Sequence, residues 1–133
     1  MEISDVRNGS SMSPLENYID AWVAGDPDRI ASAVTEDCEI IECYGPVYRG
    51  RDRVHQWAAA WFGAGGVVHR WKITDSFRAG EHEAAQWVFD FTWRGRRRSF
   101  DGSTITTSYD GRIHTLREYR TTAELYEWTG EWR

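Results

Sequence analysis

The sequence predicts an α+β fold in which three N-terminal helices pack on a curved antiparallel sheet. Apolar residues follow a helical period over most of residues 14–62, with one short strand among the helices, and they alternate with a period of two from Val67 onward. Turns that contain glycine separate the alternating segments. With 133 residues, 41% of them hydrophobic, the chain has the usual length of one domain and enough apolar side chains for a core.

Two short helices are expected first. Ser13-Pro14 predicts a helix start, because serine is a good N-cap and proline suits the first helical position. The apolar residues that follow share one helical face: Leu15, Tyr18, Ile19, Trp22 and Val23. Gly25-Asp26-Pro27 ends this helix and begins a second one, which we expect to end near Glu36-Asp37. Residues 1–13 are polar and are expected to form a flexible tail ahead of a single domain over residues 14–133.

A strand over Cys38–Cys43 and a turn at Gly45-Pro46 lead to a third helix, which begins near Arg51-Asp52. An acid in its first turn favours the positive end of the helix dipole. Four strands then follow as a meander, at about Val67–Arg78, Glu83–Arg94, Ser99–Tyr109 and Arg112–Thr121. Asp110-Gly111 predicts a tight hairpin between the last two, because a type I′ turn needs positive φ at both central residues.

Composition excludes several classes of function. Sixteen basic and twenty-one acidic residues give a net charge of −5, the wrong sign for nucleic-acid binding. The only basic cluster, Arg94-Gly95-Arg96-Arg97-Arg98, is interpreted as a solvated hairpin tip, with an anion-binding patch as the alternative. No segment approaches the length of a membrane span and no signal core is present, so we expect no membrane association and a cytoplasmic location.

The remaining chemistry-bearing residues give few motifs. Cys38 and Cys43 are expected on opposite strand faces as free thiols. His69 and His114 lack metal-ligand spacing, and no phosphate loop or nucleophile elbow is present, so we expect neither a metal nor a cofactor. The apolar residues Leu125, Trp128 and Trp132 predict that the C-terminal segment, a helical turn or an extended strap, docks on a surface that the sequence does not specify.

Three short stretches resemble a known superfamily: Tyr18 to Asp26, Tyr48 to Asp52, and Asp110-Gly111-Arg112-Ile113 before Glu118-Tyr119. With the order of elements, they are similar to the SnoaL-like branch of the nuclear transport factor 2 (NTF2)-like superfamily, which includes polyketide cyclases and is related to ketosteroid isomerases. The resemblance covers roughly residues 15–121. It implies a cone-shaped fold with a hydrophobic pocket for a small molecule, and a homodimer.

The resemblance to ketosteroid isomerases also implies roles for two residues. Tyr18 falls on their oxyanion-hole tyrosine and Glu42 on their catalytic base. The protonated aspartate that completes their oxyanion hole falls at Ile105, so half of that machinery differs here. A carboxylate among aromatic rings is desolvated, which raises its pKa and makes it a better base. The alternative for Glu42 is a surface position or an ion pair with Arg49.

Other inward positions follow from strand alternation and from the family pattern. These are Asp101 and Ser103 on one strand and Leu116, Glu118 and Arg120 on the last strand, with Trp22, Trp57, Trp87 and Phe89 as further walls of the pocket. Buried charges need partners, so an ion pair of Arg120 with Asp101 or Glu118 is the structural alternative to a catalytic network.

The leading hypothesis is a cofactor-independent isomerase or cyclase that moves a proton on a small hydrophobic molecule. Glu42 is the expected base, with Tyr18 and Asp101 as its hydrogen-bonding partners. A non-catalytic ligand-binding or dimerisation domain is the first alternative. An epoxide-hydrolase-like enzyme, with one acid activating water and the other donating a proton, is the second.

Overall fold

The computed structural model describes residues 12–133 and contains three helices and a six-stranded sheet. The helices are α1 (Pro14–Val23), α2 (Pro27–Ser32) and α3 (Arg51–Gly63). The strands are β1 (Val34–Ile41), β2 (Val47–Arg49), β3 (Val67–Ala79), β4 (His82–Trp93), β5 (Arg96–Tyr109) and β6 (Arg112–Arg120). Every element that the sequence predicts is therefore present, which confirms the α+β fold class.

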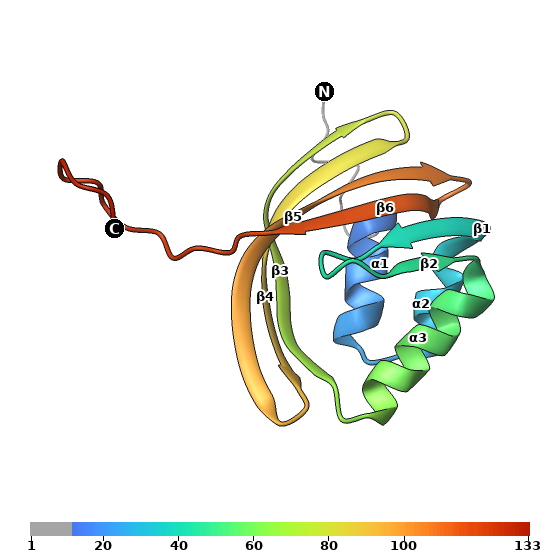
Figure 1. The fold of residues 1–133 in the computed structure, drawn as a ribbon. Helices are drawn as coiled ribbons and strands as arrows, with labels where there is room; N and C mark the ends of the chain where they lie inside the picture. Colours follow the sequence, from blue (N-terminus) through green and yellow to red (C-terminus); the bar gives the residue numbers. More distant parts are fainter. Residues whose placement is uncertain (1–11) are drawn as a thin grey trace.

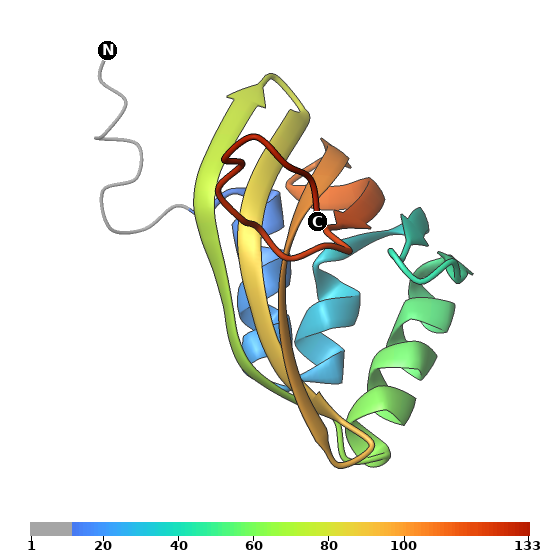
Figure 2. The same cartoon turned by 60° about the vertical axis from the view of Figure 1, so that its left-hand side comes forward.

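The sheet has the order β2-β1-β6-β5-β4-β3 and is mixed. β1 runs parallel to β6, and the other neighbouring strands are antiparallel. The sheet bends strongly, and all three helices lie on its concave side (Figure 1). Figure 2 shows the same arrangement from another side, with the convex face of the sheet turned forward.

The first helix begins where the sequence predicts. Ser13 is its N-cap and forms a capping box with Glu16. The Ser13 hydroxyl also donates to the Glu83 carboxylate on β4, 2.6 Å away, and this carboxylate accepts the Leu15 N–H at 3.4 Å. Of the expected flexible tail, Ser13 thus belongs to the fold, whereas residues 1–11 lie outside the described residues.

The boundary between α2 and β1 differs from the prediction. The helix ends at Ser32 rather than near Glu36-Asp37, and the strand begins at Val34 rather than Cys38. The cause is tertiary: the Ile113 N–H on β6 donates to the Ala33 carbonyl at 2.9 Å, and Val34 lies opposite Ile113 in the parallel ladder. Pairing with a distant strand therefore overrides the local helical pattern.

The core fills the side of the cone nearest α1 and α2. Its fully buried apolar residues come from the helices and from the inward positions of the sheet, and they include Leu15, Tyr18, Ile30, Val34, Ile40, Val54, Trp87, Ile113 and Leu116. Cys38 is buried in this core and Cys43 is partly exposed, and both are free thiols, as expected. No helix within residues 12–133 is long and apolar enough to span a membrane.

The C-terminal segment does not pack on the folded part of this chain. After Arg120 the chain leaves the sheet and extends away from the side that holds the helices (Figure 1). Leu125 is 87% exposed and Trp132 is 79% exposed. The contacts of this segment are local ones, such as the pair of Trp128 and Trp132, with ring centroids 5.2 Å apart. A surface that covers these apolar residues is therefore not found within residues 12–133.

Candidate functional site

A cavity of about 440 Å³ lies between the concave face of the sheet and the helices. Twelve of its seventeen lining residues are aromatic, and two of the others are glutamates. The complete lining consists of Tyr18, Trp22, Glu42, Cys43, Tyr44, Tyr48, Trp57, Ala60, Trp61, Trp71, Trp87, Phe89, Phe91, Trp93, Arg98, Phe100 and Glu118. A cavity of this size and lining suits a small organic molecule with apolar surface.

The cavity wall on the helix side consists mainly of aromatic residues that lie one helical turn apart on α1 and α3. Tyr18 and Trp22 on α1 meet edge to face with centroids 6.5 Å apart, and Trp57 and Trp61 on α3 both contact Trp22. Tyr48 on β2 stacks on Trp57, with centroids 3.9 Å apart and planes 8° from parallel. These ring contacts join α1, α3 and β2 into one aromatic wall.

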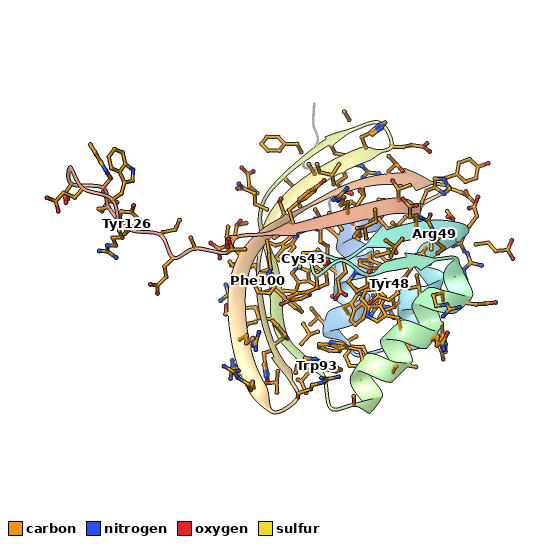
Figure 3. The ribbon with its side chains drawn as sticks, in the orientation of Figure 1. Cys43, Tyr48, Arg49, Trp93, Phe100 and Tyr126 are labelled. Atoms are coloured by element: carbon orange, nitrogen blue, oxygen red, sulfur yellow. The ribbon has the colours of Figure 1, made fainter. Side chains whose placement is uncertain are left out.

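The sheet wall is a row of aromatic residues across three strands. Trp71 on β3 lies opposite Phe89 on β4, which in turn lies opposite Phe100 on β5. Their ring centroids are 5.0 Å and 5.8 Å apart. Residues directly opposite in a ladder share a face of the sheet, so register alone places the three rings in the cavity. Figure 3 shows Phe100 on the sheet and Tyr48 on the facing β2, toward the helices.

Trp87 on β4 also belongs to this wall, and a hydrogen bond from its indole N–H group orients the ring. Its indole N–H donates to the Thr104 hydroxyl at 2.8 Å, and the residue is buried. Gly102 lies opposite Trp87 in the ladder, and a Cβ there would overlap the indole ring and the Tyr119 carbonyl oxygen. Glycine at this position therefore leaves room for the largest side chain of the wall.

Glu118 on β6 is the more strongly perturbed of the two acids. Burial, followed by repulsion from Glu42, raises the pKa of its carboxyl to about 8. One of its oxygens accepts the Cys43 backbone N–H at 3.4 Å, which offsets part of that rise. At neutral pH this carboxyl is therefore mainly protonated and is a proton donor inside the cavity.

Glu42 follows the last residue of β1, where the strand end directs it to the cavity. It accepts a hydrogen bond from the Tyr48 hydroxyl at 3.0 Å. Burial raises the pKa of Glu42, and the hydrogen bond from Tyr48 lowers it. Because that bond stabilises the charged form, Glu42 is the better candidate for a carboxylate base. The alternative pairing does not occur, since Arg49 pairs with Glu39.

Three polar atoms of the cavity wall are buried without a hydrogen-bond partner among the described residues: the hydroxyl of Tyr18 and the indole N–H groups of Trp22 and Trp71. Buried donors normally have partners, so these three groups are exceptions among the described residues. Burial and the nearby Glu118 raise the pKa of Tyr18 well above its usual value, which keeps its hydroxyl protonated. Tyr18 is thus a neutral phenol close to the two carboxyls of the cavity.

The structure brings most of the predicted site residues together. Tyr18, Glu42, Trp22, Trp57, Trp87, Phe89 and Glu118 all line the cavity. Leu116 is buried in the core instead, on the same face of β6 as Glu118. Arg120 is exposed and lies over the rings of Tyr44 and Phe100, 4.9 Å and 5.5 Å from their centroids. No ion pair joins Arg120 to either predicted acid within residues 12–133, so the structural alternative is absent there.

Asp101 and Ser103 do not lie on the inward face of the sheet, contrary to the prediction. Asp101 lies opposite Val88 and Ser103 opposite Gln86, on the outer face of the sheet, while Gly102 and Thr104 occupy the inward positions. Asp101 is exposed, so the prediction that it points into the cavity is wrong. The error is a one-residue shift in phase, which moves every side chain of a strand to the other face. Glu118 is the acid that the cavity contains in its place.

His69 and His114 each have side-chain partners on neighbouring strands or loops. His69 contacts the Thr92 hydroxyl at 2.7 Å, and His114 contacts Thr35 at 3.1 Å and Asp37 at 3.5 Å. Within the described part of the chain, no group of three or more histidine, cysteine or acidic side chains is arranged to hold a metal ion.

The comparisons with known proteins agree with this architecture. The model of the SnoaL-like domain matches residues 15–115, which is most of the chain. The chain belongs to the SnoaL-like family. This membership confirms the resemblance seen in the sequence. No curated protein matches the sequence significantly.

Several solved structures share the fold of this SnoaL-like chain. A hypothetical protein with a ketosteroid isomerase-like fold from Catenulispora acidiphila, in complex with trimethylamine, has a TM-score of 0.73 at 19% identity, over 83% of this chain and 86% of that one. An LEH-like epoxide hydrolase from M. tuberculosis has a TM-score of 0.73 at 19% identity, over 81% and 80%. A protein assigned as a polyketide cyclase from Xanthomonas campestris has a TM-score of 0.66 at 18% identity, over 80% and 86%. At these identities the likeness concerns the fold.

Proposed function

We propose that this protein is a cofactor-independent enzyme that isomerises or cyclises a small molecule by acid–base proton transfer in the aromatic cavity. The observation that carries the proposal is the pair Glu42 and Glu118, two carboxyls in one cavity with different environments. Pairs of this kind divide the roles of base and acid between two chemically identical groups. The folds shared with a ketosteroid isomerase-like protein and a polyketide cyclase support the same reaction class.

The roles follow from the electrostatics. Glu42, held by Tyr48, accepts a proton from a carbon atom next to a carbonyl group of the substrate. Negative charge then develops on the carbonyl oxygen, and the free Tyr18 hydroxyl or the protonated Glu118 donates a hydrogen bond to it. The proton returns from Glu42 to another carbon, or the enolate attacks a second carbonyl group. Neither step needs an electron acceptor or a metal ion.

The test uses a generic carbon acid, 5-nitrobenzisoxazole. Removal of its ring C–H proton breaks the N–O bond and releases a coloured cyanophenolate, so a general base in an apolar cavity accelerates the reaction. We expect a faster reaction than with the same concentration of acetate, and a loss of at least tenfold in Glu42→Gln. The control Glu124→Gln changes an exposed acid of the C-terminal segment and should keep the rate. No acceleration by the unmodified protein would contradict the proposal.

A second candidate is an epoxide-hydrolase-like reaction. The protonated Glu118 would donate to the epoxide oxygen while Glu42 activates a water molecule, and one solved structure of this fold is an LEH-like epoxide hydrolase. Styrene oxide is a suitable probe, because diol formation is measured directly by chromatography. If neither probe reacts while small molecules still bind in the cavity, the non-catalytic binding role is the remaining function.

A further inference from the structure

The cavity combines two features that attract positive charge. Its walls present mostly ring faces and edges, and the face of an aromatic ring attracts cations through its quadrupole. Its two acids, Glu42 and Glu118, have no arginine or lysine ion-pair partner within residues 12–133. Acids on the outer surface, in contrast, have ion-pair partners: Glu39 pairs with Arg49, and Asp90 pairs with Arg97. The interior therefore holds negative charge that the protein does not balance.

The protein already places a cation over rings at the cavity. The Arg120 guanidinium lies over Tyr44 and Phe100, both lining residues, at 4.9 Å and 5.5 Å from the ring centroids. Arg98, the only basic residue of the lining, is exposed. Basic side chains thus lie at exposed positions, and no basic residue of the lining is buried beside Glu42 and Glu118.

We propose that the cavity binds a small organic cation, an alkylammonium compound whose charge is balanced by Glu42 and Glu118 and whose methyl groups pack on the tryptophan rings. The inference deepens the proposed function, on whose cavity it rests, because it gives the substrate class. With one proton shared between the two acids the site has one negative charge, which a monocation neutralises. The second carboxyl then stays available for proton transfer.

The contribution of the positive charge is tested by comparing a cation with a neutral molecule of the same shape. Choline and 3,3-dimethyl-1-butanol differ in one atom, because a carbon replaces the quaternary nitrogen, and their volumes are nearly equal. Burial of apolar surface is therefore similar for the two, while only choline gains from the carboxylates and the ring faces. We expect choline to bind at least tenfold more tightly in isothermal titration calorimetry at pH 7.5.

The pH dependence gives a second readout. Glu118, with a pKa of about 8, loses its proton between pH 7 and pH 9, so the affinity for choline should rise over this range and that for the alcohol should not. Choline itself stays charged throughout. Glu42, the other acid of the cavity, only gains charge over this range, and the basic residues Arg98 and Arg120 lie at exposed positions. The pKa of Cys43 is raised to about 12, and those of Tyr18 and Tyr48 are raised too, so these groups stay neutral.

Two variants test whether Glu118 contributes to binding of the cation. At pH 9, where Glu118 is ionised, Glu118→Gln should weaken choline about tenfold and leave the alcohol unchanged, whereas Glu124→Gln should change neither. Circular dichroism establishes that each variant is folded. If both ligands bind the unmodified protein equally, or if choline does not bind at millimolar concentration, the inference is overturned. Because choline has no reactive carbon acid, its binding is independent of the reaction with 5-nitrobenzisoxazole, so either proposal can fail alone.

Discussion

The carboxyl of Glu118 and that of Glu42 share one aromatic cavity, and the charge of Glu42 adds to burial in raising the pKa of Glu118 to about 8. The two groups come from different parts of the chain, the end of β1 and the middle of β6, which the parallel pairing of these strands brings together. Their coupling is the most specific electrostatic feature of the site, and it can be measured directly.

Removal of the Glu42 charge should lower the pKa of Glu118. In Glu42→Gln the pKa of Glu118 should fall below 8 but remain above its ordinary value, because burial is the larger cause and persists. Infrared spectroscopy of the protonated carboxyl band as a function of pH measures this change. The exposed Glu124→Gln should leave the titration of Glu118 unaltered. An unchanged titration in Glu42→Gln would mean that the two carboxyls do not interact.

Stability should fall as the pH rises from about 4.3, the ordinary glutamate value, to about 8. In this window the folded protein keeps the Glu118 proton and the unfolded chain has lost it. Each pH unit therefore removes up to about 1.4 kcal/mol from the free energy of unfolding. The stability contribution of this group is complete below the window and is lost above it.

Urea unfolding at pH 6 and pH 9 tests this dependence. In Glu118→Gln the buried charge is absent, so the variant should be more stable than the unmodified protein at pH 9 and show a smaller loss between the two pH values. Equal losses in both proteins would assign the pH dependence to other groups.

The Gly102 position should not tolerate a side chain. Gly102→Ala introduces a methyl group that overlaps Trp87 and the backbone of Tyr119, and we expect a destabilisation of about 1–3 kcal/mol. Gly63→Ala is the matched control, because nothing lies within 4 Å of a Cβ at this helical glycine, and it should stabilise by up to about 1 kcal/mol. The free energy of unfolding in urea measures both. Equal effects would mean that β5 and Trp87 shift without cost.

The C-terminal segment should be dispensable for the fold of the protomer. Thr121 still bonds to the Asp101 carbonyl oxygen through its N–H and hydroxyl groups at 2.9 Å and 3.0 Å, so a chain that ends after Thr122 keeps the end of β6. Because the residues beyond are exposed, we expect the same thermal unfolding midpoint for the shortened and the full chain. A clearly lower midpoint would show that the segment packs on protein in solution, and light scattering would then identify a partner protomer.

The order of helices and strands was predictable because it depends on local signals. Ser13-Pro14 and Asp110-Gly111 act within a few residues, and the structure has the N-cap and positive φ at both turn residues where they are expected. The end of α2 was not predictable from such signals, because it depends on the pairing of Ala33 and Val34 with the distant Ile113.

The candidate site was predicted in part. Tyr18, Glu42 and the main tryptophans were found, but Asp101 was placed on the wrong face and Glu118 was named only as a binding residue. One signal was overlooked: Arg94-Gly95 forms a two-residue turn with positive φ at both positions, and this turn fixes Asp101 opposite Val88. Val88 lies between the inward residues Trp87 and Phe89, so strand alternation directs it and Asp101 outward. The same register would have found Phe100 opposite Phe89. The raised pKa of Glu118, in contrast, depends on burial and on a neighbour 76 residues away in the chain, which no local pattern contains.

Six of the eight tryptophans line the cavity, and the other two, Trp128 and Trp132, are in the exposed C-terminal segment. Indole emission depends strongly on nearby charges and on water. The chain therefore contains its own fluorescent reporter, in which cavity occupancy changes the signal of six rings at once. Removal of the residues after Thr122 would eliminate the two solvent-exposed emitters, and unlabelled compounds could then be screened against the site without a known substrate.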